Sequence, residues 1–299
     1  MVQPPILLAL GPQIDYPGSL PNLLIGRQLA TVLLDAGLAV RVLIDEAATG
    51  WPSGVEVFTG SVTRPSEVPA AFAEIVALFL AGADPATAYE ALALARAGGA
   101  QKVVTLSSHG PTVEVALPPD HWHWLAIEVI AERSGLAWTH VVPSLVMGVT
   151  LTGSYPLVGA SWHELITRGE PIRRPFADAR VPFIHERDLA EIVAIALREP
   201  AYDGRTIHAT GVGISDRERA QLLGDVLGHQ IAFEPLTREQ AEQQYREQGL
   251  DEDTIAYVLD TAAWFAEHNN DGSAEPESIL GRPLRSYADW AREHAAAFV

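Results

Sequence analysis

Several residues in the middle of the chain have the types and the spacing for proton transfer. His109 follows an apolar stretch and two serines, and the run Asp120-His121-Trp122-His123 comes soon after. An imidazole titrates near neutral pH, and a neighbouring carboxylate can orient it, so these side chains suit general acid–base catalysis. We therefore expect the catalytic residues to include His109, His121, Ser107, Asp120 and His123.

Other kinds of site are less well supported at these positions. Helical metal ligands favour i, i+4 spacing, whereas His121 and His123 are two apart and no third ligand is evident, so no metal site is expected. Ser107 lies outside any Gly-x-Ser-x-Gly nucleophile elbow. For His121 and His123 taken singly, helix capping and packing remain an open alternative, and His140 and His185 are expected to be structural.

Aromatic and sulfur-containing side chains beside these residues suit an apolar substrate, aromatic or polyketide-like. On a helix, His121 and Trp124 share one side, while Trp122 and His123 point elsewhere. The run Pro143-Ser144-Leu-Val-Met147 follows a further apolar stretch. Large apolar walls with a few polar groups are typical of small-molecule sites. The expected substrate-binding residues are Trp122, Trp124, Ser144 and Met147.

The elements that must position these residues alternate between short apolar runs and helical patterns. Continuous apolar strands separated by helices indicate an α/β fold, a doubly wound parallel sheet of the Rossmann-like type, which binds ligands beyond the carboxyl ends of its strands. Asp84-Pro85 suits a helix cap and first turn. The expected strands cover 6–10, 39–44, 55–59, 75–80, 102–107 and 138–142, and the expected helices cover 25–36, 84–97 and 120–134.

The pattern of helices and short strands in the second half of the chain predicts a smaller C-terminal α/β lobe. We expect a Rossmann-like domain over 1–150 and a substrate lobe over 151–299, with residues from about 180 to 210 able to return to the main sheet. The acidic run 251–253 suits a helix N-terminus. Helices are expected at 161–168, 188–198, 215–227, 237–248, 251–267 and 286–298, and short strands at 180–184, 206–209 and 231–233.

Composition excludes several classes of function. The 299 residues carry 38 acidic against 20 basic side chains, a formal net charge of −18, which repels nucleic acid and anionic lipid. The chain lacks cysteine, so disulfides and thiolate chemistry are excluded, and Lys102 is its only lysine. No signal sequence or membrane span is evident. We expect a cytoplasmic protein that acts on a small molecule, and its oligomeric state stays open.

Six segments together resemble a known family, the NmrA-like atypical short-chain dehydrogenases/reductases. The resemblance covers nearly the whole chain in family order and implies a Rossmann domain, a small C-terminal substrate lobe and, usually, a nicotinamide dinucleotide. The segments are 54–60 (GVEVFTG), 100–108 (AQKVVTLSS), 134–143 (SGLAWTHVVP), 181–190 (VPFIHERDLA), 204–211 (GRTIHATG) and 280–291 (LGRPLRSYADWA).

The cofactor loop of this chain departs from the family pattern. The family has Gly-x-x-Gly-x-x-Gly after the first strand, whereas here Gly11 and Gly26 are separated by a long segment over 12–25, and Leu23 stands where the middle glycine belongs. Three prolines in this segment remove amide donors that a diphosphate needs. Alternatively, the segment bulges outward and Gly11, Gly18 and Gly26 still hold a nucleotide. If the segment covers the vacated site, Asp15 and Tyr16 join the catalytic candidates.

Two further positions bear on the cofactor. Asp45 follows the second strand about 20 residues after Gly26, where an acidic residue binds the ribose 2′-hydroxyl and favours NAD over NADP. A solvated loop residue is the alternative for Asp45. Ser61 stands where the family usually has an Asp that contacts adenine, which weakens the case for a nucleotide.

Ordinary carbonyl reduction in short-chain dehydrogenases depends on Tyr-x-x-x-Lys, and this chain cannot contain that pair. Its only lysine follows Gly98 by four residues, and the two family positions fall near Asp120 and Trp124. We therefore expect a repurposed enzyme that needs no cofactor and performs redox-neutral acid–base chemistry: isomerisation, cyclisation, dehydration or carbon–carbon cleavage of a natural product. Two alternatives stay open: an NAD(P)-dependent reductase of quinone-like or conjugated substrates, and a non-catalytic dinucleotide sensor.

Overall fold

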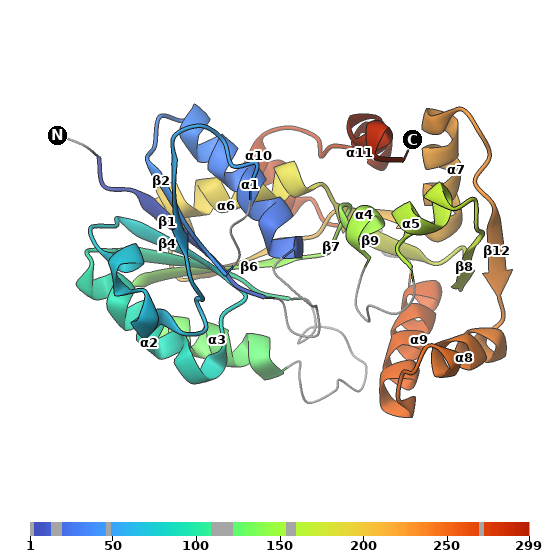
Figure 1. The fold of residues 1–299 in the computed structure, drawn as a ribbon, viewed down its shortest axis with the longest axis horizontal. Coiled ribbons are helices and arrows are strands. Elements are labelled where there is room, and N and C mark those ends of the chain that lie inside the picture. The colour runs from blue at the N-terminus through green and yellow to red at the C-terminus, as the bar shows by residue number, and fades with distance from the viewer. Residues whose placement is uncertain are drawn as a thin grey trace. The chain divides into compact units, whose positions relative to one another are not determined.

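In the computed structural model the chain forms two compact units (Figure 1). Unit 1 comprises Met1–Pro111, Pro119–Pro143 and Glu186–Ala209, and unit 2 comprises Thr112–Pro118, Ser144–His185 and Thr210–Val299. The structure describes residues 3–12, 20–45, 49–108, 122–153, 160–268 and 272–298.

Unit 1 is built on a parallel sheet of seven strands with the order β10-β6-β5-β4-β1-β2-β3. The chain leaves β1 toward β2 and β3 on one side and then returns to β4 on the other side, so the strand order reverses between β1 and β4. The strands are β1 (Ile6–Leu10), β2 (Val40–Ile44), β3 (Val55–Thr59), β4 (Ala77–Ala81), β5 (Lys102–Leu106), β6 (Ala137–Pro143) and β10 (Arg205–Ala209).

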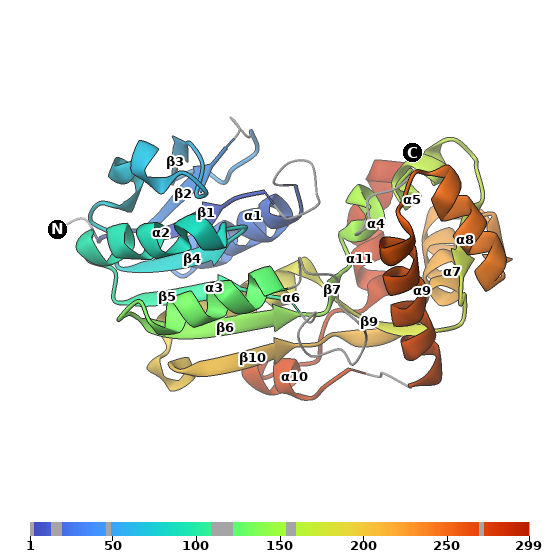
Figure 2. The ribbon, with the colours of Figure 1, turned by 90° about the horizontal axis from the view of Figure 1, so that it is seen from below.

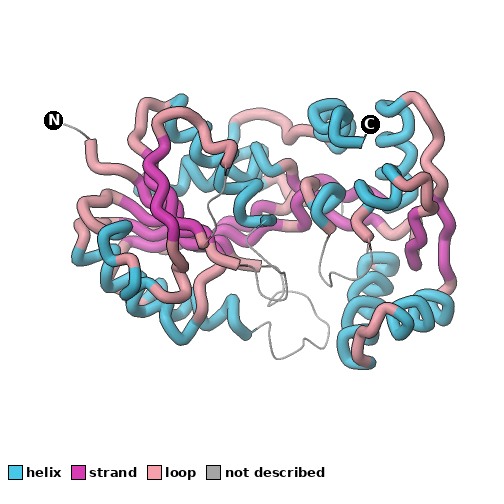
Figure 3. The backbone as a smooth tube through the Cα atoms, in the orientation of Figure 1, coloured by secondary structure: helices cyan, strands magenta, loops and turns pink. Residues whose placement is uncertain are grey.

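Helices cover both faces of this sheet, which confirms the doubly wound prediction. Figure 2 shows α2 and α3 on one face and α1 and α6 on the other, and Figure 3 shows the strands between these layers. Strands β1, β2, β4 and β5 are buried along their whole length because both faces are covered. The helices are α1 (Leu20–Asp35), α2 (Pro85–Ala97), α3 (Trp122–Glu132) and α6 (Glu186–Arg198), and short 3-10 helices span Pro65–Glu67, Pro69–Phe72 and Pro200–Tyr202.

Local sequence signals explain the helix boundaries. Asp84 caps α2 by accepting a hydrogen bond from the Ala86 amide at 2.8 Å, and Pro85 occupies the first helical position, as expected. Helix α1 begins at Leu20 rather than at the predicted residue 25. Proline is compatible with a first helical turn, so Pro21 does not prevent this earlier start.

The single lysine is structural and belongs to unit 1. The side chain of Lys102 is 9% exposed, and its Nζ donates to the carbonyl oxygens of Ala196 at 2.7 Å and Glu199 at 2.9 Å. It also pairs with Asp203. A cation at the end of α6 complements unpaired carbonyl groups there. Lys102 therefore links the start of β5 to the end of α6 through hydrogen bonds.

Unit 2 contains two small sheets and a set of short helices. One sheet has the order β11-β9-β7, and β12 pairs with β8 in parallel. Its strands are β7 (Leu145–Val146), β8 (Ile172–Pro175), β9 (Arg180–Ile184), β11 (Val212–Ser215) and β12 (Phe233–Leu236). Its helices are α4 (Val149–Thr152), α5 (Trp162–Thr167), α7 (Asp216–Leu227), α8 (Arg238–Glu247), α9 (Glu252–Glu267), α10 (Glu275–Leu280) and α11 (Tyr287–His294), with a 3-10 turn at Ala295–Phe298.

Reciprocal caps begin four of these helices. In each, a serine or threonine accepts from the amide three residues later, and the side chain of that later residue accepts from the cap amide. Such a cap typically stabilises a helix by about 1 kcal/mol. The four pairs are Ser161/Glu164, Ser215/Glu218, Thr237/Gln240 and Ser286/Asp289.

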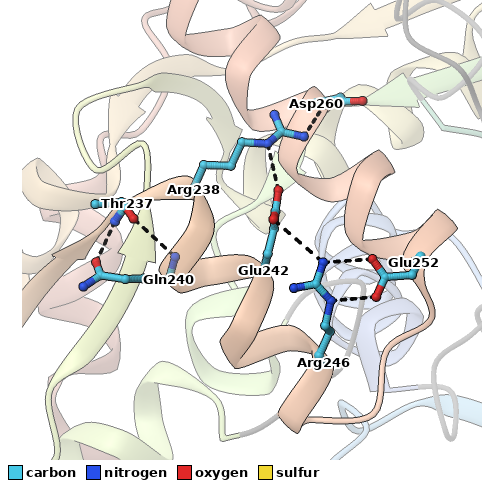
Figure 4. Close-up of polar contacts among 7 residues, drawn as sticks. All are labelled: Thr237, Arg238, Gln240, Glu242, Arg246, Glu252 and Asp260. Atoms are coloured by element: carbon cyan, nitrogen blue, oxygen red, sulfur yellow. Dashed lines mark hydrogen bonds and ion pairs between the residues drawn. The ribbon is translucent and has the colours of Figure 1, made fainter.

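Charged residues on α8 and α9 pair with one another above a small core (Figure 4). Arg238 pairs with Glu242 at 3.1 Å and with Asp260 at 2.7 Å, and Arg246 pairs with Glu252 at 2.7 Å. The expected acidic helix start at 251–253 is present, with Asp251 as the cap of α9. These carboxylates are accounted for by ion pairs and capping. The core beneath them contains Ala241, Tyr245, Ile255 and Leu259.

None of the helices within the described residues combines the length and the apolar character needed to span a bilayer. In the same part of the chain, no group of three or more His, Asp or Glu side chains could hold a metal ion.

Candidate active site at the carboxyl edge of the parallel sheet

Two glycines bring the ends of β1 and β4 into backbone contact where the strand order reverses. A Cβ atom on Gly11 would lie 2.2 Å from the Gly82 oxygen, and one on Gly82 would lie 2.5 Å from the Gly11 oxygen. Gly82 also has φ +74°, a conformation that favours glycine. Close packing of the two backbones therefore requires glycine at both positions. Doubly wound sheets bind their ligands at this crossover.

The first helix is held against the end of β1 by two residues of its first two turns. A Cβ atom on Gly26 would lie 2.3 Å from Leu10 Cδ1, so this glycine permits close packing of helix on strand. Asn22 is 3% exposed, and its Nδ2 donates to the Gly11 oxygen at 3.0 Å. Sequence reasoning missed Asn22, because the helix was expected to begin only at residue 25.

The end of β2 carries groups of opposite charge. Asp45 directly follows β2 and is exposed. Arg27 on α1 donates from Nη2 to the Thr49 oxygen at 2.5 Å, and its Nε is buried with no hydrogen-bond partner among the described residues. Arg27 is a second residue that sequence reasoning missed, and its position directly after Gly26 was the signal. A ribose 2′-hydroxyl suits the carboxylate, and a 2′-phosphate suits the guanidinium.

A serine and a carboxylate meet where β5 ends. Ser107 is 5% exposed and donates from Oγ to Oε1 of Glu128 on α3 at 2.5 Å. Sequence reasoning named Ser107 but missed Glu128. The signal was helical spacing, because Glu128 lies one turn after Trp124 and on the same side of the helix.

A buried histidine extends this polar cluster. His140 on β6 is 1% exposed, its Nδ1 lies 2.7 Å from Thr105 Oγ1, and its ring stacks on Trp138 with centroids 4.5 Å apart. Its Nε2 lies 3.5 Å from Oε1 of Glu132, whose side chain is 45% exposed. Burial lowers the pKa of His140, while the nearby Glu128 and Glu132 carboxylates oppose that shift in part. His140 is therefore mostly neutral at pH 7.

This lowered pKa makes folding sensitive to acid. Because the unfolded chain binds the His140 proton at higher pH than the folded protein does, the free energy of unfolding should fall as the pH drops below about 6.5. His140→Gln should lose less stability between pH 7.5 and 5.5 than the wild type in urea titrations. Parallel losses in the two proteins would show that another group causes the acid sensitivity.

The other catalytic candidates divide between described and undescribed residues. His123 on α3 is half-buried, and its ring contacts the edge of Trp124 with centroids 5.4 Å apart. Trp122 is 67% exposed. Five candidates lie outside the described residues: Asp15, Tyr16, His109, Asp120 and His121.

Ser144 and Met147, both expected to bind substrate, lie in unit 2. Ser144 is 6% exposed, and its Oγ accepts from the Gly211 amide at 2.9 Å. Met147 is 1% exposed and packs in the hydrophobic core with Phe183 and Trp290. Core packing and a backbone hydrogen bond account for both residue types.

Comparison with known proteins gives matches over most of the chain. The model of the NmrA-like family matches residues 24–291. A (4-alkanoyl-5-oxo-2,5-dihydrofuran-3-yl)methyl phosphate reductase from Streptomyces griseus is 29% identical, covering 92% of this chain and 95% of its own. An NAD(P)H azoreductase from Xenophilus azovorans is 25% identical over 92% of this chain and 96% of its own. A triphenylmethane reductase from Citrobacter sp., solved with NADP(H), has a TM-score of 0.68 at 17% identity, covering 97% of this chain and 99% of its own.

The expectation that no cofactor is required is wrong. The azoreductase is named for NAD(P)H, and the similar triphenylmethane reductase was crystallised with NADP(H). The expectation relied on the linear spacing of Gly11 and Gly26. In the folded chain Gly11 instead meets Gly82, and helix α1 begins at Leu20 within the segment that we expected to be a long loop.

Proposed function

Because the chain belongs to the NmrA-like family, we propose that it is an NAD(P)H-dependent reductase of an electron-poor, conjugated small molecule. The names of its relatives support this substrate class. An azo group, an acyl-substituted dihydrofuranone and a triphenylmethane dye all accept a hydride into a conjugated system. A natural product with an apolar acyl chain, as in the alkanoyl-substituted dihydrofuranone phosphate, is the finer part of the proposal.

The reversal of strand order between β1 and β4 carries the proposal, because doubly wound sheets bind dinucleotides at this crossover. When bound there, the nicotinamide dinucleotide supplies the hydride. The start of α1 would receive the pyrophosphate, and Gly26 keeps that helix close to β1. The cofactor-free acid–base alternative has no support from the Streptomyces and Xenophilus relatives, which are both named as reductases.

Nucleotide binding and turnover test this function together. Isothermal titration with NADH and NADPH should give micromolar binding, and loss of reduced-nucleotide absorbance should require an added azo dye or naphthoquinone. Absence of binding at millimolar nucleotide would overturn the proposal. Tight binding without turnover for any conjugated acceptor would instead favour a dinucleotide sensor.

Asp45 sets the expected preference between the two nucleotides. An exposed carboxylate after β2 can accept from the 2′-hydroxyl of NADH and repels the 2′-phosphate of NADPH, so NADH should bind more tightly. Asp45→Ala should weaken NADH binding by about 10-fold, equivalent to about 1.4 kcal/mol, and improve NADPH binding. Glu67→Ala is a suitable control at an exposed carboxylate on the turn after β3. Tighter NADPH binding in the wild type, lost in Arg27→Ala, would assign nucleotide preference to Arg27 instead.

A further inference from the structure

The Ser107–Glu128 contact places a carboxylate of helix α3 next to the carboxyl end of strand β5. The backbone of Ser107 is already bonded into the sheet, since its amide donates to the Val141 oxygen at 2.8 Å. Its hydroxyl forms a second hydrogen bond, to Glu128 at 2.5 Å, which is not part of the β5–β6 backbone ladder. Helix α3 packs along β5 and β6, as Figure 2 shows, and brings Glu128 to this position.

The direction of this hydrogen bond depends on the protonation of Glu128. An ionised carboxylate only accepts, so the Ser107 hydrogen is directed toward Glu128. A protonated carboxyl group can donate to Ser107 Oγ, which frees the serine hydrogen to turn away. Ser107 stands at the carboxyl edge of the sheet, where ligands of this fold bind. One proton on Glu128 therefore decides whether Ser107 can donate to a ligand at that edge.

The cluster also extends toward solvent. The Glu128 and Glu132 carboxylates both lie near enough to His140 to favour its charged form. His140 Nε2 is 3.5 Å from the half-exposed Glu132, and Nδ1 is 2.7 Å from Thr105 Oγ1. Glu128 is itself partly exposed, so it can exchange a proton with solvent, and His140 and Glu132 are further titratable groups near it.

We propose that Ser107 and Glu128 deliver the proton that completes reduction of the substrate, in place of the absent Tyr-x-x-x-Lys pair. This inference rests on the proposed reductase function. Hydride addition to an azo bond forms one N–H bond and leaves a negative charge on the other nitrogen. That nitrogen takes the Ser107 proton, Ser107 takes the Glu128 proton, and Glu128 is reprotonated from solvent. The sum is R–N=N–R′ + NAD(P)H + H⁺ → R–NH–NH–R′ + NAD(P)⁺.

Two kinds of acceptor separate proton delivery from hydride transfer. An azo dye such as methyl red needs a hydride and a proton. A triarylmethyl cation such as malachite green needs only a hydride, because hydride addition gives the neutral leuco dye. Loss of a proton donor should therefore slow reduction of the azo dye and spare reduction of the cation, whereas a structural defect should slow both.

The experiment compares Glu128→Gln and Ser107→Ala with the wild type on both dyes. Both variants should lower kcat for methyl red at least 100-fold, as expected for loss of a general acid, and keep malachite green within about twofold. Glu90→Gln, at an exposed carboxylate on α2, is the matched control and should change neither rate. Equal slowing of both dyes, or unchanged azo reduction in Glu128→Gln, would overturn the inference.

A measurement without nucleotide or dye tests the pair itself. In protein labelled with ¹³C at glutamate carboxyl groups, the Glu128 resonance is the one lost in Glu128→Gln. Ser107→Ala should move that resonance at a fixed pH, because it removes the 2.5 Å hydrogen bond to the carboxyl group. An unmoved resonance would overturn the inference even if the protein is a reductase. A wild type that oxidises no NAD(P)H with either dye, despite a moved resonance in Ser107→Ala, would locate the failure in the proposed function.

Discussion

Arg219→Ala is expected to lower the free energy of unfolding of unit 2 by about 3–5 kcal/mol, whereas Arg217→Ala, two residues earlier, should leave it nearly unchanged. Both arginines lie on α7 and both form an ion pair with an aspartate. They differ in burial, since the side chain of Arg219 is 3% exposed and that of Arg217 is 48% exposed.

The large effect follows from what surrounds the Arg219 guanidinium. It donates to Asp216 at 2.9 Å and to Thr150 Oγ1 at 2.7 Å. Its Cζ lies 4.2 Å from the ring centres of both Trp162 and Phe183, so desolvated cation–π contacts add to the ion pair. Alanine would leave a cavity among these rings and remove one of the two arginines that pair with Asp216.

Urea unfolding followed by tryptophan fluorescence measures this difference, because Trp162 and Trp290 both lie in the unit 2 core. The Arg217 pair is solvated and screened by salt, so its removal should be hard to detect. Equal destabilisation by the two substitutions would mean that burial of the Arg219 cluster contributes little to the folded state.

Gly82→Ala is expected to destabilise unit 1 by more than about 3 kcal/mol and to weaken nucleotide binding at least 10-fold. Gly37→Ala provides a matched control. The two glycines have nearly the same backbone conformation, with φ of +74° and +75°. A Cβ on Gly82 would lie 2.5 Å from the Gly11 oxygen, whereas one on Gly37 would meet nothing within 4 Å.

The left-handed conformation should lower the free energy of unfolding by about 1–2 kcal/mol in each alanine variant. Any further loss of stability in Gly82→Ala measures the backbone contact at the ends of β1 and β4. Thermal unfolding and isothermal titration with NADH give the two readouts. If Gly82→Ala binds NADH as tightly as Gly37→Ala does, the crossover edge would not be the nucleotide site.

The architecture of unit 1 was predictable because strands buried on both faces must be continuously apolar. The runs at 6–10 and 102–106 could therefore be assigned from their residues alone. Local rules also worked for Asp84, which caps α2 as expected. The start of α1 was placed too late, because the whole of 12–25 was interpreted as an inserted loop, whereas the helix begins at Leu20 with proline in its first turn, where proline is tolerated.

The site was less predictable because its contacts join residues far apart in the sequence. Gly11 was judged by its spacing from Gly26, but its structural partner is Gly82, which directly follows strand β4. Ser107 was recognised from its place at the carboxyl end of a strand, yet Glu128 became relevant only once α3 was packed on β5. For His109 and His121, the proposed catalytic roles remain predictions for residues outside the described part of the chain.

The position of the only lysine also determines how this protein reacts with laboratory reagents. Acylating dyes and amine cross-linkers react with a free, unprotonated amine, which is the nucleophile. Lys102 Nζ is instead held between two carbonyl oxygens and Asp203 in the interior of unit 1. Its side chain should therefore resist labelling in the folded protein and react once the end of α6 separates from β5. Covalent modification of this one amine, followed by mass spectrometry, would give a time-resolved signal for the opening of unit 1.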